Sequence, residues 1–144
     1  MTTTRYKHWS DVNPAHWYWP NFTPKEIACQ QYHPTKGMCG CGGSLIVNHK
    51  AMNALQAFRT IIGVPFTPNS ACRCQKHNRN WGGAPASKHL EGIAFDIPIL
   101  PGMSRDLIKE TARQVGFTGI GDYDTFNHVD TRDNPAYWDL RSKK

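Results

Sequence analysis

Two histidines and one aspartate in this chain have the side chains needed to bind a metal ion. His89 and Asp96 lie seven residues apart in the segment SKHLEGIAFD, and His128 follows in the distant segment HVD. Two imidazoles and one carboxylate are a complete three-ligand set for a catalytic zinc, with the fourth position left for water. If the three side chains meet in space, the chain is a metal-dependent hydrolase.

The surroundings of the aspartate support this interpretation. Asp96 stands inside an apolar run, between Phe95 and Ile97. Burying a carboxylate costs free energy unless it is paired or bound to a metal, although an Asp hydrogen-bonded to backbone is the simpler alternative. Side chains alternate along a strand, so a strand through the HVD segment would place His128 and Asp130 on one face.

Four stretches have the patterns of elements that would position these groups. Apolar residues recur at helical spacing over 49–62 and 105–115, and a glycine follows each stretch, so both are predicted helices. The apolar run 93–99 and the segment 127–130 are strand candidates. The predicted fold class is α+β: a small antiparallel sheet that carries the metal site, flanked by the two helices.

The segments between these elements have weaker signals. Thr23 begins a capping box that predicts a short helix over 24–30. The Gly- and Cys-rich residues 31–44 predict a loop, and residues 71–86 predict a long loop or a short helix over a site. Residues 135–138 are expected to begin a turn or a short helix.

A chain of 144 residues is long enough for one core and too short for two comfortable domains, so one domain is predicted over 1–144. Its first 22 residues include Trp9, Trp17 and Trp19. We interpret residues 1–22 as an aromatic arm that packs its indoles on the body of the domain. An exposed aromatic surface that binds sugar is the alternative.

The net charge limits the classes of partner. A formal charge of +6 at pH 7 favours a polyanionic partner: nucleic acid, an anionic membrane or an anionic cell wall. The basic residues are scattered and form no nucleic-acid-binding motif, so nucleic acid is not expected as the partner. No apolar run reaches the ~18 residues of a membrane span, and the N-terminus lacks the apolar centre of a signal peptide. We therefore expect synthesis in the cytoplasm.

Five cysteines cannot all pair in disulfides, and reduced thiols are the default for a cytoplasmic product. The alternative is a structural zinc held by Cys39 and Cys41 with Cys29 and one of Cys72 or Cys74. The spacing of these cysteines is not that of the usual CxxC knuckle.

The sequence resembles a known family at two motifs and along much of its length. The motifs are Ser87-x-His89-x2-Gly92-x-Ala94-x-Asp96, then Gly121 and His128-Val129-Asp130-Thr131-Arg132. They resemble the M15 family of zinc D,D-peptidases, which includes D-alanyl-D-alanine carboxypeptidases and phage endolysins. The M15A-type branch of phages, prophages and gene-transfer-agent particles is the most similar. Further similarity lies in Ser70-Ala71-Cys72-Arg73 with His77-Asn78 and in the aromatic arm, so that it covers most of residues 5–140.

The resemblance implies roles for particular residues. His89, Asp96 and His128 would be the zinc ligands. Arg73 matches the family arginine near the metal, where a guanidinium could hold a substrate carboxylate or stabilise the oxyanion; a structural salt bridge is the alternative. Ser87 could bind the substrate peptide or cap a turn.

The general base is less defined. Many relatives carry a carboxylate three residues before the last histidine, where this chain has Thr125. The candidates, in order of preference, are Asp130, Asp124 and Glu91. For Asp130 the alternative is a salt bridge to Arg132 or Arg73.

The resemblance also implies the fold of zinc D-Ala-D-Ala carboxypeptidases and an enzyme that cleaves amide bonds in peptidoglycan stem peptides or cross-links, with Zn²⁺ as cofactor. We expect a monomer of endolysin type that reaches the cell wall after holin-type release or as a phage particle component. Two alternatives stay open: a catalytically inactive wall-binding module of the same fold, and a zinc D-dipeptidase acting on small free peptides.

Overall fold

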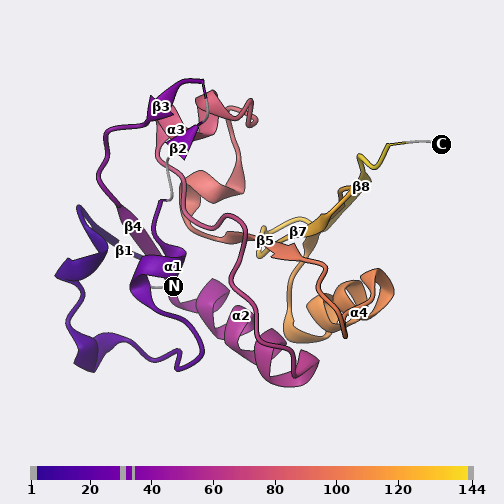
Figure 1. Ribbon diagram of the computed structural model, residues 1–144. Helices are drawn as coiled ribbons and strands as arrows, with labels where there is room; N and C mark the ends of the chain where they lie inside the picture. Colours follow the sequence, from indigo (N-terminus) through magenta and orange to yellow (C-terminus); the bar gives the residue numbers. More distant parts are fainter. Residues whose placement is uncertain (1–2, 30–31, 34, 143–144) are drawn as a thin grey trace.

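A four-stranded sheet in the C-terminal half of the computed structural model carries two of the three predicted metal ligands, Asp96 and His128 (Figure 1). The structure describes residues 3–29, 32–33 and 35–142. The strands are β5 (Ala94–Pro98), β6 (Gly119–Asp122), β7 (Phe126–Asp130) and β8 (Ala136–Asp139), in the order β5-β7-β6-β8. β7 pairs antiparallel with β5 and β6, and β8 adds a parallel edge to β6. The predicted α+β class with a small antiparallel sheet is confirmed.

Two helices pack together beside this sheet. They are α2 (His49–Ile62) and α4 (Arg105–Val115), and both have the predicted bounds. Each ends at a glycine in the left-handed conformation, Gly63 at φ 70° and Gly116 at φ 105°, which residues with a Cβ rarely adopt. Local capping and periodicity therefore determine both helices.

Alternate side chains of β5 and β7 face the hydrophobic core and the metal site. Phe95 and Ile97 of β5 and Val129 of β7 are buried in the hydrophobic core. Asp96 and His128 alternate with them and are paired across β5 and β7. The strand pattern therefore puts a carboxylate and an imidazole side by side on the face away from the core.

The N-terminal part builds a second layer of the molecule. β1 (Thr3–Tyr6) pairs antiparallel with β4 (Leu45–Asn48), and the 3₁₀ turns η1 (Trp9–Asp11) and η2 (Pro14–His16) follow β1. Trp19 is only 2% exposed, and its indole N–H donates to Asn53 of α2 at 2.9 Å. This indole thus lies in the core.

The remaining predictions have mixed outcomes. The capping-box helix is present but shorter, as α1 (Pro24–Ile27). The stretch 71–86 contains a short helix, α3 (Gln75–Asn80), beside the small hairpin of β2 (Tyr32–His33) and β3 (Gly37–Met38) (Figure 1). The turn or short helix expected from 135 is wrong, because β8 occupies this stretch. Among the described residues, no helix has both the length and the apolar character to cross a bilayer.

Candidate metal centre

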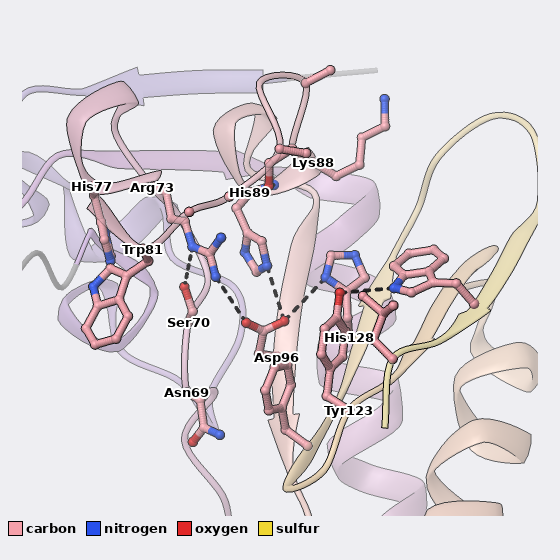
Figure 2. A pocket seen from close by; sticks show the side chains of 18 of the residues that line it. Asn69, Ser70, Arg73, His77, Trp81, Lys88, His89, Asp96, Tyr123 and His128 are labelled. Atoms are coloured by element: carbon pink, nitrogen blue, oxygen red, sulfur yellow. Dashed lines mark hydrogen bonds and ion pairs between the residues drawn. The ribbon is translucent and has the colours of Figure 1, made fainter. Parts of the chain in front are cut away.

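The three predicted ligands converge on one point of the structure (Figure 2). Asp96 and His128 are cross-strand neighbours, and His89 comes from the 3₁₀ turn η3 (Lys88–Glu91) that precedes β5. Asp96 Oδ1 lies 3.2 Å from His89 Nε2 and 3.3 Å from His128 Nδ1. All three residues are buried.

A backbone acceptor fixes the ring of His89. Its Nδ1 lies 2.6 Å from the carbonyl oxygen of Ala71, so the N–H is donated there and Nε2 keeps its lone pair on the side of Asp96. Gly92, at φ 72°, ends the turn and lets the chain enter β5. A Cβ at this glycine would lie 2.5 Å from a methyl carbon of Ile46, so both conformation and space require glycine.

A carboxylate fixes the ring of His128 in the same way. Its Nε2 lies 2.7 Å from Asp130 Oδ2, which leaves the Nδ1 lone pair on the side of Asp96. Asp130 is fully buried, and Arg132 binds both of its oxygens, with Nε at 2.9 Å and Nη2 at 2.7 Å. The alternative predicted for Asp130, an ion pair with Arg132, is therefore present.

This donor set fits a zinc ion. With metal–ligand distances of 2.0–2.1 Å, two ligands of a tetrahedral zinc lie about 3.3 Å apart. The ligand atoms of the three residues all lie within 4.8 Å of one another, and two of the separations are 3.2 and 3.3 Å. Each imidazole also has its other nitrogen held by an oxygen, an arrangement that metal-ligating histidines almost always have. His89, Asp96 and His128 are thus the residues that would hold the metal.

The two histidines keep the carboxylate of Asp96 ionised. Burial alone would raise the pKa of Asp96, but His89 and His128 outweigh it and hold that pKa well below its usual range. Burial lowers the pKa of His89. For His128, burial acts in the same direction, but hydrogen bonds and charges from Asp130 and Asp96 raise the pKa overall. The ionised carboxylate of Asp96 and the unprotonated ring of His89 suit a divalent cation, whereas a proton on His128 would compete with the metal.

Arg73 lies at the edge of this centre. Its Nη2 is 3.3 Å from Asp96 Oδ2, its Nε donates to Ser70 Oγ at 3.0 Å, and its Nη1 donates to Asn78 Oδ1 at 3.3 Å. These contacts use three of the five guanidinium N–H groups and fix the plane of the side chain. The predicted alternative, a structural salt bridge, is present as the pair with Asp96, while Arg73 also lines the cleft.

The neighbouring backbone explains how Arg73 reaches the ligands. Asp96 N donates to Ser70 O at 2.9 Å, and Asn69 N donates to Asp96 O at 2.8 Å, so this segment runs along the open edge of β5. Arg73 N also donates to His89 O at 3.2 Å. The segment therefore joins Arg73 to both the strand and the turn that carry ligands.

The centre opens into a cleft of about 970 Å³, a size typical of small-molecule and peptide sites. Side chains from α3 and the following loop form one wall, and residues from β7, β8 and the loop before β7 form the other (Figure 2). Ser87 lines the cleft, and its Oγ also accepts from His89 N at 3.3 Å, so it caps the turn as well. Ser87 therefore caps the turn and also lies where it could contact a substrate peptide.

Sequence reasoning missed the aromatic residues of this cleft, which are Trp81, Tyr123, Phe126 and Trp138. Across the sheet, Asp96, His128, Gly121 and Trp138 lie in one row. A Cβ at Gly121 would lie 2.4 Å from Trp138 Nε1, so the glycine makes room for the indole. That indole donates to the hydroxyl of Tyr123 at 3.0 Å. Tyr123 precedes His128 by only five residues, but the position of Trp138 follows from β8, which has no local signal.

The three carboxylates considered as base lie outside the cleft lining. Asp130 is behind the His128 ring, and Asp124 accepts hydrogen bonds from Ser142 N and Oγ at 2.7 and 2.8 Å. Glu91 is exposed and pairs with Lys88 at 3.0 Å. Among the described lining residues, Asp96 is the one carboxylate.

Comparison with known proteins agrees with this site. A family model described as Peptidase M15 matches residues 20–131, which is more than half of the chain and includes the three ligands and Arg73. A search of curated proteins found no match. The predicted resemblance to M15 peptidases is confirmed, and the chain belongs to the peptidase M15 family.

Proposed function

We propose that this M15 peptidase is a zinc enzyme that hydrolyses amide bonds in peptidoglycan peptides. The convergence of His89, Asp96 and His128 at the floor of the cleft is the observation that carries the proposal. The chain's net charge of +6 supports an anionic cell wall as the place of action. The D-amino-acid substrate class rests on the resemblance of the motifs to D,D-peptidases.

The chain's own groups have separable roles in this proposal. A zinc ion held by the three ligands would supply Lewis-acid polarisation of an amide carbonyl and a more acidic water. Ala71 O and Asp130 hold the two imidazoles with their lone pairs toward that position. Arg73 presents N–H donors to a substrate carboxylate or to the oxygen of the attacked amide.

The aromatic wall of the cleft suits a small peptide. Tyr123 stacks on Phe126 with ring centroids 4.6 Å apart, and Trp138 lies 5.2 Å from the His128 ring. These faces can pack against short aliphatic side chains and exclude water from the reacting amide.

The direct test is mass spectrometry of fragments from purified peptidoglycan digested with the full chain. We expect fragments that arise by cleavage next to a D-amino acid. A chelator should abolish their formation, and added zinc should restore it. His89→Ala and His128→Ala should be inactive, whereas His16→Ala, an exposed histidine of η2, should act as the wild type.

Three results would contradict the proposal in different ways. Zinc-loaded protein that binds sacculi and releases no fragment would indicate a wall-binding module. Cleavage of free D-dipeptides without action on sacculi would indicate a dipeptidase. Full activity in either histidine variant would refute the ligand assignment.

A further inference from the structure

A second group of metal-binding side chains lies outside the cleft. Their sulfur atoms all lie within 4.8 Å of one another, and the residues are Cys29, Cys39, Cys41 and Cys74. We name these four the cysteine cluster. They come from three separate stretches: the residues after α1, those after the β2–β3 hairpin, and the N-cap of α3. Such convergence of distant thiols needs a physical cause.

The spacing of the sulfurs fits a tetrahedral metal. With Zn–S distances of about 2.3 Å, two sulfurs of a tetrathiolate site lie about 3.8 Å apart. The observed upper limit of 4.8 Å requires only a small contraction around an ion. None of the five cysteines, all of which lie in the described part of the chain, is in a disulfide bond.

Hydrogen-bond donors surround the cluster in the way that thiolate ligands require. Every sulfur accepts at least one bond: Cys74 N donates to Cys29, Cys41 N to Cys39, Ser44 Oγ to Cys41, and His77 N to Cys74. These four donor–sulfur distances run from 3.3 to 3.5 Å, and His77 Nδ1 lies 3.0 Å from Cys29 Sγ. N–H and O–H groups directed at sulfur stabilise the negative charge that thiolates carry when they bind a metal.

The fifth cysteine has a different environment. Cys72 is 3% exposed, donates its S–H to Ile46 O at 3.2 Å and accepts from Ile46 N at 3.3 Å. It packs in the hydrophobic core and is not part of the cluster. It therefore provides a matched control within the same chain.

We propose that the cysteine cluster binds a second zinc ion, as a structural site separate from the metal centre of the cleft. Four thiolates in tetrahedral arrangement select zinc or iron, and the closed set leaves no position for substrate. The inference does not depend on the proposed peptidoglycan activity.

This ion would hold one wall of the cleft in place. Cys74 directly follows Arg73, and His77 lines the cleft while its Nδ1 contacts Cys29 Sγ at 3.0 Å. The cluster thereby joins α3 to the segment that follows the β2–β3 hairpin, in which each strand contributes two residues to the ladder. A small, loop-rich region of this kind gains much of its stability from a metal.

Metal counting on the full chain tests the proposal. Protein purified under reducing conditions with zinc should contain two zinc ions per chain by plasma mass spectrometry. His89→Ala/His128→Ala should retain one, and Cys41→Ser/Cys74→Ser should also retain one. Cys72→Ser should retain two. After replacement by cobalt, the sulfur-to-metal charge-transfer bands should be present in the histidine variant and absent from the variant of Cys41 and Cys74.

A measurement on the wild type covers the case in which the cysteine variant does not fold. X-ray absorption at the zinc edge should show sulfur neighbours at about 2.3 Å. Absence of zinc–sulfur scattering, two disulfides in the cluster, or iron in place of zinc would overturn the proposal. The zinc content of His89→Ala/His128→Ala reports on the cysteine cluster alone, because this variant lacks two of the cleft ligands. The test of the second zinc site is therefore independent of whether the proposed peptidase activity is found.

Discussion

Asp130 Oδ2 lies 2.7 Å from Nε2 of His128, on the opposite side of the ring from Asp96. The small residue Gly119 is paired with Asp130 on β6, and a Cβ there would lie 2.1 Å from Asp130 Oδ1. The sheet thus makes room for a fully buried carboxylate whose contacts are His128 and Arg132. This geometry favours orientation of the His128 ring over abstraction of a proton from a water in the cleft.

Asp130→Asn separates the two roles. If Asp130 orients His128, zinc affinity at the cleft site should fall about 10–100-fold, and excess zinc should restore much of the activity. If Asp130 is the base, zinc should be retained while turnover falls at least ~10²-fold. Competition titration with a fluorescent chelator measures the zinc affinity, and kcat at saturating zinc measures the turnover.

Asp124→Asn is the control, since Asp124 contacts Ser142 and lies outside the cleft lining. A large loss of activity in this variant would transfer the base role to Asp124.

Arg73→Lys tests whether the guanidinium binds substrate. Lysine keeps the charge but cannot reproduce the planar set of donors that now binds Ser70, Asn78 and Asp96. We expect kcat/KM to fall about 10²-fold with zinc content unchanged. Steady-state kinetics on a stem peptide, together with metal analysis, checks this. Loss of zinc with an unchanged kcat per bound metal would show instead that Arg73 acts by holding Asp96.

Local signals explain why much of this molecule could be predicted from the sequence. The bounds of α2 and α4 follow from periodicity and from terminal glycines, which act within a few residues. The candidate ligand set was predictable because two imidazoles and a carboxylate suit zinc, and the resemblance assigned that role to His89, Asp96 and His128.

Non-local pairing explains what was missed. Residues 136–139 become a strand through parallel pairing with β6, a contact that local propensity does not encode, so Trp138 could not be placed in the cleft. The position of Asp130 relative to the ring nitrogens of His128 is also invisible in the sequence, because alternation fixes only the face of the strand. A buried orienting carboxylate and a base in the cleft have the same sequence pattern.

Zinc binding at the cleft should weaken as the pH falls. A proton on His128 competes with the metal, and the carboxylates of Asp130 and Asp96 raise the pKa of this imidazole above its ordinary value. Affinity should therefore be full well above that raised pKa and fall by up to about tenfold per pH unit below it. In Asp130→Asn the pKa of His128 falls, so the decline should begin at lower pH. Zinc titrations across a pH series check this, on two proteins that both carry Cys41→Ser/Cys74→Ser, one with Asp130 and one with Asp130→Asn. An identical pH profile in these two proteins would contradict the link between Asp130 and His128.

Away from the metal centre, Asp122 is a buried structural charge. It is fully buried, its oxygens accept from Asn127 Nδ2 at 2.6 Å and from the Tyr137 hydroxyl, and it pairs with Arg105 at 3.2 Å and Lys109 at 3.0 Å. Burial alone would raise the pKa of Asp122, but these donors and cations outweigh it and lower the pKa below its ordinary value of 3.8. The carboxylate thus joins α4, the β6–β7 hairpin and β8.

Asp122→Asn should lower the free energy of unfolding at pH 7 by about 2–4 kcal/mol, because two partly buried cations lose their anion. The pKa is lower in the folded state, so this contribution is fully present above the unfolded value of 3.8 and is lost progressively as the pH falls below it toward the lower folded pKa. Urea unfolding should therefore show a large difference in the free energy of unfolding between wild type and variant at pH 7, and a smaller difference at pH 3.

Asp139→Asn is the control, because it breaks an exposed pair with Arg141 and should change the stability little at either pH. An Asp122→Asn protein as stable as the wild type at pH 7 would show that the ion pairs add nothing beyond the neutral hydrogen bonds of Asn127 and Tyr137.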